Sequence, residues 1–108
     1  MSEHRYVLTL KLKNDPNLIT SYKKYHEEVW PEVLDNFKLC DINSIEIYLL
    51  DTLLVMVMIV GPNFSFERKV ALEKENKVVQ KWEKLMSTYQ ETPTSGDKWK
   101  IMDSIFKF

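Results

Sequence analysis

Large apolar residues recur at every second position in two segments, and that spacing is typical of β-strands. In the first segment one face carries Tyr6, Leu8, Leu10 and Leu12. In the second, one face carries Ile45, Ile47 and Leu49, and the other carries Glu46 and Tyr48. Asp51 and Thr52 then connect tightly to an apolar run over 53–60. We therefore expect a first strand over 6–12, and a hairpin of 44–50 with 53–60 whose second strand is buried on both faces.

Helical spacing of apolar residues predicts two helical regions. The first begins at Asp15, a suitable N-cap, with Pro16 at the first helical position, and we expect it to run to about Trp30. Pro31 has no backbone N–H, so the helix should kink or restart there, with an apolar stripe of Val33, Leu34 and Phe37. The second region covers about 66–89, where one face carries Val78, Trp82, Leu85, Met86 and Tyr89.

A loop over 92–97 and a closing strand over 103–108 complete the order β-α-β-β-α-β. This order predicts an α+β, ferredoxin-like fold, in which helices cover one face of an antiparallel sheet. We expect residues 1–108 to form a single domain of this kind. The other face of the sheet has too many apolar side chains to stay in water. It should close over a ligand or pack on a second copy, and a homodimer is the simpler expectation.

Charge and composition exclude several classes of function. Fifteen Lys and Arg against 16 Asp and Glu leave a net charge of −1, which argues against a nucleic-acid partner. Two glycines are too few for a phosphate-binding loop, and two distant histidines with the single Cys40 give no metal-ligand spacing. The longest apolar run is too short to cross a membrane, and the charged N-terminus does not resemble a signal peptide. We expect a cytoplasmic protein without membrane attachment, because Cys40 suits a reducing compartment.

The segment 22–31 holds the densest group of chemically useful side chains. Tyr22 and His26 are four residues apart, so they lie one above the other on a helix, and Trp30 follows four residues later. Rings with polar edges suit a sugar, and an imidazole gives or accepts a proton near neutral pH. Trp82, on the second helical region, is another candidate. Both sets also fit simple core packing, so spacing alone leaves the two interpretations open.

The pattern Tyr22-x3-His26-x3-Trp30-Pro31-Glu32 resembles the signature of the L-rhamnose mutarotase family, which includes L-fucose mutarotase-like proteins. Three further segments are similar to family segments in the same order: 45–48, 79–82 and 102–108. The resemblance implies one mutarotase-like domain and a dimeric α/β barrel. It also implies cofactor-free interconversion of the α and β anomers of a deoxyhexose such as L-rhamnose or L-fucose.

The resemblance also implies roles for individual residues. His26 matches the family's proton donor, while Tyr22 and Trp82 match residues that contact the sugar. Ile45 stands where the family has a pocket tyrosine, and Glu83 where it has a second tryptophan, so hydroxyl recognition should differ. The residues expected to bind substrate are Tyr22, Trp30, Ile45, Trp82 and Glu83, with His26 catalytic and no metal ligand. The sequence does not identify the general base, for which a bound water and Glu83 are the candidates.

Two alternatives remain at this point. A cofactor-free monooxygenase or isomerase could use the same dimeric scaffold, because a fold alone does not determine function. Such an enzyme would act on flat, apolar substrates and would need fewer hydrogen-bonding groups around His26. A non-catalytic sugar-binding dimer is the other alternative, and the departures at Ile45 and Glu83 are what keep it open.

Overall fold

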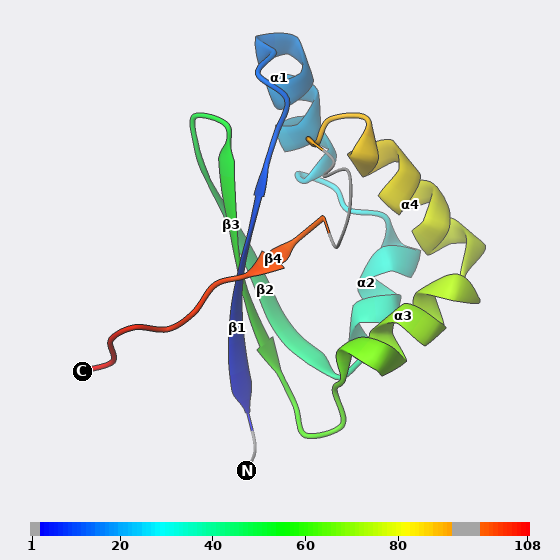
Figure 1. Ribbon diagram of the computed structural model, residues 1–108. Coiled ribbons are helices and arrows are strands. Elements are labelled where there is room, and N and C mark those ends of the chain that lie inside the picture. The colour runs from blue at the N-terminus through cyan, green and yellow to red at the C-terminus, as the bar shows by residue number, and fades with distance from the viewer. Residues whose placement is uncertain (1–2, 92–97) are drawn as a thin grey trace.

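The computed structural model describes residues 3–91 and 98–108. Within these residues, one antiparallel sheet has the strand order β2-β3-β1-β4. The strands are β1 (His4–Lys11), β2 (Ile42–Leu50), β3 (Leu53–Val60) and β4 (Lys100–Ile101). The helices are α1 (Pro16–Tyr25), α2 (Pro31–Leu39), α3 (Phe66–Lys74) and α4 (Lys77–Ser87). The helices lie on one side of the sheet and leave the other side uncovered (Figure 1), which is the α+β, ferredoxin-like arrangement expected from the sequence.

The first strand and the hairpin form as predicted. Leu50 pairs with Leu53 across the turn, and Asp51 adopts a positive φ of 54°, which a two-residue connection of this kind requires. Leu8, Leu10 and Leu12 are buried beneath the helices. The alternation in the sequence therefore identifies correctly which face of β1 enters the core.

The expectation that 53–60 is buried on both faces is wrong for this chain. Leu54, Met58 and Val60 are buried on the helix side. On the opposite face, Val55, Val57 and Ile59 are only half-buried. The reason is that successive strand residues point to opposite faces, and within the described residues only one face is covered by helices. We call the uncovered side the open face.

Two apolar clusters fill the space between the sheet and the helices. The first cluster consists of Leu12, Tyr22, Val33, Leu54, Val79, Trp82 and Met86. The second cluster consists of Leu8, Cys40, Ile42, Met58 and Val60. The free thiol of Cys40 is thus part of the core, where burial raises its pKa.

The first helix is shorter than predicted. It begins at Pro16 with the Asp15 side chain as N-cap, as expected, but it ends at Tyr25 rather than near Trp30. A proline disfavours helical geometry in the residue before it, and Trp30 accordingly has an extended ψ of 134° as the N-cap of α2. The chain therefore restarts a helix at Pro31, which was one of the two outcomes predicted there. In α2, Val33 is buried, but Leu34 is exposed.

The second helical region is two helices rather than one. α3 ends at Lys74 and α4 starts at Lys77, because the side chain of Asn76 caps α4 by accepting hydrogen bonds from the backbone N–H groups of Val78 and Val79. The buried face of α4 includes Trp82 and Met86 as predicted, but Val79 is buried in place of Val78. Val79, Trp82 and Met86 are the buried residues, and Val78 is half-buried.

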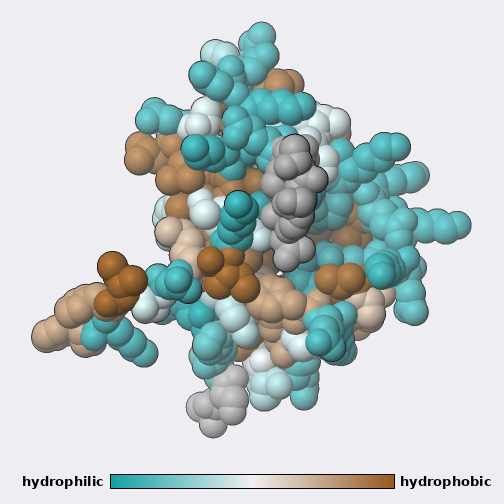
Figure 2. Space-filling view, in the orientation of Figure 1, coloured by the Kyte–Doolittle hydropathy of each residue, from teal (hydrophilic) through white to brown (hydrophobic). Residues whose placement is uncertain are grey.

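The predicted closing strand over 103–108 is wrong. The last strand is β4, which pairs with Leu8 and Thr9 of β1. After Met102 donates a hydrogen bond to the carbonyl oxygen of Val7, the chain leaves the sheet on its open side (Figure 1). Its apolar residues then project from the body (Figure 2): Ile105, Phe106 and Phe108 are exposed. An alternating pattern forms a strand only where a partner strand is available, and this tail pairs with no strand among the described residues.

The predicted loop over 92–97 lies outside the described residues. Among the residues that the structure describes, no helix has both the length and the apolar character needed to span a membrane.

Candidate active site

Four rings from three parts of the chain meet at the first cluster, to which Tyr22 and Trp82 belong. Tyr22 and His26 come from the end of α1, Trp30 precedes α2, and Trp82 lies on α4. The ring centroids of Tyr22 and His26 are 4.4 Å apart, and those of His26 and Trp82 are 5.6 Å apart. Trp30 meets Trp82 edge to face at 5.2 Å. We call these four side chains the ring group. The structure thus brings together four of the six residues predicted for the site.

The end of α1 fixes the orientation of His26. Its Nδ1 atom lies 2.8 Å from the backbone carbonyl oxygen of Tyr22, one of the carbonyls that a helix end leaves without an intrahelical partner. A carbonyl oxygen only accepts hydrogen bonds, so Nδ1 must carry the hydrogen and donate it. The other nitrogen, Nε2, is then the atom that can take up or release a proton. The His26 side chain is half-buried, so it is not sealed inside the core.

Tyr22 is a buried phenol that stays protonated. Only 4% of the residue is exposed, and its hydroxyl oxygen accepts a hydrogen bond from Nε2 of Gln90 at 3.4 Å. Burial raises the pKa of Tyr22 to about 12; the hydrogen bond from Gln90 opposes this rise, and the negative charge of Glu83 adds to it. Near neutral pH the phenol is therefore a hydrogen-bond donor and not an anion.

Trp82 is buried about as deeply as Tyr22. It is 5% exposed and packs in the first cluster, and the expectation that its ring contacts the sugar stays a prediction. Trp30 is half-buried and packs against the same cluster from its edge. Trp82 therefore supports the rings of His26 and Trp30, while Trp30 leaves more of its own surface accessible to a ligand.

Glu83 and Ile45 lie outside the ring group. The carboxylate of Glu83 is 3.3 Å from Nζ of Lys98, and that lysine also donates to Oγ of Ser87 at 2.9 Å. The negative charge of Glu83 nevertheless contributes to the raised pKa of the Tyr22 hydroxyl. Ile45 packs against the second cluster, opposite Met58 in the sheet, and not among the four rings.

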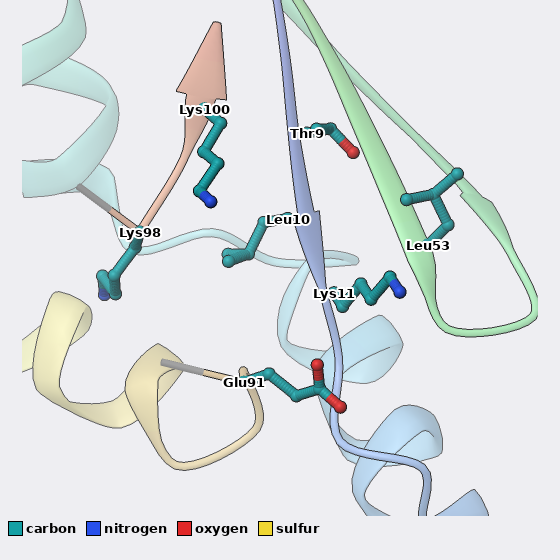
Figure 3. A pocket seen from close by; sticks show the side chains of 7 residues that line it. All are labelled: Thr9, Leu10, Lys11, Leu53, Glu91, Lys98 and Lys100. Atoms are coloured by element: carbon teal, nitrogen blue, oxygen red, sulfur yellow. The ribbon is translucent and has the colours of Figure 1, made fainter. Parts of the chain in front are cut away.

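Two of the hollows on the surface of the described residues are not lined by the ring group. The first, of about 280 Å³, lies at the edge of β1 (Figure 3) and is lined by Thr9, Leu10, Lys11, Leu53, Glu91, Lys98 and Lys100. The second is also about 280 Å³ and is lined by Val70, Glu73, Lys74, Val79, Gln80 and Glu83. Both are near the lower limit of the volumes that enclose small ligands. Glu83 is the one predicted site residue among these lining residues.

One further residue of interest was not found from the sequence. Gln90 is buried and contacts Tyr22, 68 residues earlier in the chain. Gln90 lies just after α4 and belongs to no sequence motif, so only the folded structure reveals its contact with Tyr22. Among residues 3–91 and 98–108, no group of three or more His, Cys, Asp or Glu side chains is arranged to hold a metal ion.

Comparison with known proteins agrees with the sequence resemblance. The chain is 36% identical to an L-fucose mutarotase of Xanthomonas campestris pv. campestris, over 98% of this chain and 89% of that protein. It is 32% identical to a UPF0734 protein of Dictyostelium discoideum, over 94% and 86% of the two chains.

A solved structure and a family profile extend this comparison. The fold matches the crystal structure of an L-rhamnose mutarotase from Formosa agariphila with a TM-score of 0.73 and 18% identity, covering 97% of this chain and 98% of that one. Residues 5–108 match the family described as L-rhamnose mutarotase. This protein therefore belongs to the L-rhamnose mutarotase family.

Proposed function

We propose that this protein interconverts the α and β anomers of a deoxyhexose, with L-fucose and L-rhamnose as the first candidates. Membership of the family makes it a mutarotase, which is an isomerase acting on carbohydrates. The names of its relatives support both sugars. The observation that carries the proposal is His26, whose Nδ1–H is held by the helix end while Nε2 stays available for proton transfer.

The reaction needs only an acid and a base, and the atoms balance without a further reactant. Protonated His26 gives the proton on Nε2 to the ring oxygen, and a base takes the proton of the anomeric hydroxyl. The bond between the ring oxygen and the anomeric carbon breaks, and an aldehyde forms. After rotation about the adjacent carbon–carbon bond, the same steps in reverse close the ring as the other anomer. Positioned acid–base help of this kind accelerates a reaction by roughly 10²–10⁴-fold.

The neighbours of His26 supply binding and orientation. The buried hydroxyl of Tyr22 donates a hydrogen bond to a sugar oxygen, because its raised pKa keeps it protonated. Trp30, which is half-buried, offers an apolar ring face to the C–H groups of the sugar. Trp82 holds the rings of His26 and Trp30 in place and remains a predicted contact of the sugar. Glu83 accepts a hydrogen bond from a sugar hydroxyl at the rim. Ile45 remains a predicted substrate-binding residue, and its place in the second cluster favours an indirect role.

We further propose that residues 1–108 act as one domain and that two copies associate through their open faces. The central strands place Val7, Val55, Val57 and Ile59 there, all only half-buried in the single chain. A second copy would remove this apolar surface from water, and two-fold pairing is the commonest form of assembly. A cytoplasmic location without a nucleic-acid partner fits the net charge of −1 and the free thiol of Cys40.

The decisive experiment is proton NMR magnetisation exchange between the α and β anomeric signals of L-fucose and L-rhamnose. Micromolar protein should speed exchange for at least one of them well above the rate in buffer, and D-glucose serves as a sugar with a full set of hydroxyl groups for comparison. Unchanged exchange rates for every monosaccharide would refute the proposal. Binding of a deoxyhexose without faster exchange would instead favour the non-catalytic sugar-binding dimer.

A further inference from the structure

Gln90 is a buried polar residue that the function proposed above does not use. It follows α4, and only 3% of it is exposed. Its backbone forms a β-bridge with Leu12. The residues on either side add two backbone hydrogen bonds. The N–H of Lys13 donates to the carbonyl oxygen of Tyr89 at 2.9 Å, and the N–H of Glu91 donates to the carbonyl oxygen of Lys11 at 2.8 Å. The main chain at Gln90 is therefore fastened to the end of β1, and the side chain starts from a fixed point.

The amide of Gln90 is directed at one partner. Its Nε2 donates to the hydroxyl oxygen of Tyr22 at 3.4 Å. Its Oε1 is inaccessible to solvent and has no hydrogen-bond partner among the described residues. A buried amide oxygen without a partner destabilises a fold, and an apolar side chain of similar shape would avoid that loss. Stability alone therefore does not account for an amide at this position.

The contact decides what the hydroxyl of Tyr22 can do. Its oxygen accepts the N–H of Gln90, so its own hydrogen is not used in this bond. No described residue accepts that hydrogen. Because the pKa of Tyr22 is raised to about 12, the hydrogen stays on the oxygen at neutral pH. The phenol beside His26 thus has a free donor.

We propose that Gln90 is a positioning residue of the mutarotase site. Its N–H group holds the oxygen of Tyr22 and thereby leaves the phenolic hydrogen free to donate to an oxygen of the sugar. The inference rests on the function proposed above and adds to it a residue that does not touch the substrate. If the amide were reversed, Tyr22 would donate to Oε1 and its hydrogen would be unavailable to the sugar.

A double-mutant cycle tests whether Gln90 acts through Tyr22. Gln90→Met keeps the length of the side chain and removes the amide. In the wild-type background we expect kcat/KM for anomer exchange to fall by about tenfold, the usual effect of one lost hydrogen bond. In a Tyr22→Phe background the same change should have less than about a twofold effect, since no hydroxyl remains to be held. A purely structural role would give equal losses in both backgrounds and would overturn the inference.

Gln90→Glu gives a second, independent readout because it replaces the donor with an acceptor. While the carboxyl is ionised, Tyr22 donates to it, and kcat/KM should be lower than in Gln90→Met. As the pH falls and the carboxyl becomes protonated, it can donate to Tyr22 as the amide did, so activity relative to Gln90→Met at the same pH should recover. A constant ratio between these two variants across the pH range would contradict the inference.

Different results would refute the proposed mutarotase function and the role of Gln90. If the wild-type protein accelerates exchange for no sugar, the proposed function is refuted and the role of Gln90 falls with it. If the wild type is active but the cycle shows no coupling, only the role of Gln90 is refuted. The ¹³Cζ NMR signal of Tyr22 in Gln90→Met and the wild type reports the hydrogen bond without any activity: a shift is expected, and an unchanged signal would contradict the contact.

Discussion

The Nδ1 atom of His26 donates to the backbone carbonyl oxygen of Tyr22, 2.8 Å away and four residues earlier in α1. Because α1 ends at Tyr25, this carbonyl belongs to the last turn, where helices lack internal partners. One helix end therefore performs two tasks: it places the rings of Tyr22 and His26 together, and it selects the nitrogen of His26 that remains free for proton transfer.

Substitutions at His26 can test the roles of its two ring nitrogens separately. In His26→Asn the side-chain amide can occupy the place of Nδ1 and donate to the same carbonyl, but nothing replaces Nε2. We expect kcat to fall by roughly 10²–10⁴-fold, the usual contribution of a positioned acid or base. Anomer exchange by NMR measures this loss, and thermal unfolding should show a change of less than about 1 kcal/mol, because the hydrogen bond is kept.

Two control variants complete this test. His26→Gln offers an amide near the place of Nε2 that cannot titrate, so it should be as inactive as His26→Asn. His26→Ala removes the hydrogen bond to Tyr22 as well and should be less stable than His26→Asn, which keeps that bond, by about 1 kcal/mol. Near wild-type activity in a folded His26→Asn protein would exclude Nε2 from proton transfer.

The stability of the protein should depend on Tyr22 at high pH. Tyr22→Phe leaves the amide of Gln90 without its partner, so at pH 8 we expect a loss of about 1–3 kcal/mol in the free energy of unfolding. The folded pKa of Tyr22, about 12, is above its ordinary value of 10. The unfolded chain therefore loses the phenolic proton first, and the wild type loses stability as the pH rises from 10 through 12.

The phenylalanine variant has no such proton, so the gap between the two proteins should narrow with pH. At pH 11 it should be about 1.4 kcal/mol smaller than at pH 8, for a pKa difference of two. Urea unfolding at both pH values gives the comparison, and contributions of the other tyrosines and the lysines cancel in the difference. A gap that stays constant, or that widens, would contradict a raised pKa for Tyr22.

Glu83 should affect sugar binding more than the chemical step. Glu83→Gln keeps the shape of the side chain, removes its charge and breaks the ion pair with Lys98. If Glu83 accepts a hydrogen bond from a sugar hydroxyl, KM should rise by about fivefold to tenfold while kcat changes by less than about threefold. Stability should change by less than about 1 kcal/mol, since the pair is partly exposed.

The matched control for this prediction is Lys98→Met, which removes the cation and keeps Glu83. It should leave KM within about twofold of the wild type if the lysine pairs with Glu83 but does not contact the sugar. A fall in kcat of about 100-fold in Glu83→Gln would identify Glu83 as the general base instead.

Local pattern predicts most of the fold, and it fails where the tertiary structure decides. Alternation gives β1 and the hairpin, and Asp15-Pro16 gives the start of α1. The end of α1 was misplaced because the apolar spacing continues past Tyr25, whereas the backbone geometry imposed by Pro31 does not. The strand predicted over 103–108 failed for a similar reason: the pattern is present, but a strand needs a partner.

The contacts of the site were also predictable only where they are local in the sequence. The spacing of Tyr22 and His26 on one helix is local, so their contact could be predicted, and the structure confirms it. The contact of Trp82 with His26 joins two distant helices, and it was anticipated only through the family resemblance. Gln90 could not be found, because its contact with Tyr22 depends on how residues after α4 pair with β1. Whether Ile45 contacts the sugar stays a prediction.

We expect the open face of the sheet to be the interface between two copies of the chain. Val57 lies opposite Val7 on one side and Glu46 on the other, in the middle of this face. If two copies pack there, Val57→Asp would bury two carboxylates without partners at the interface, which is strongly unfavourable. We expect the variant to be a folded monomer where the wild type is a dimer, as measured by light scattering after size-exclusion chromatography.

Val70→Asp is the matched control, because Val70 is 50% exposed on α3, away from the open face. It introduces the same charge and should leave the dimer intact. Because the ring group lies on the helix side of the sheet, the monomeric Val57→Asp protein should still bind the sugar, and its anomer exchange reveals how far the site depends on the second copy. A wild-type protein that is monomeric at millimolar concentration, or a Val57→Asp variant that remains dimeric, would exclude the open face as the interface.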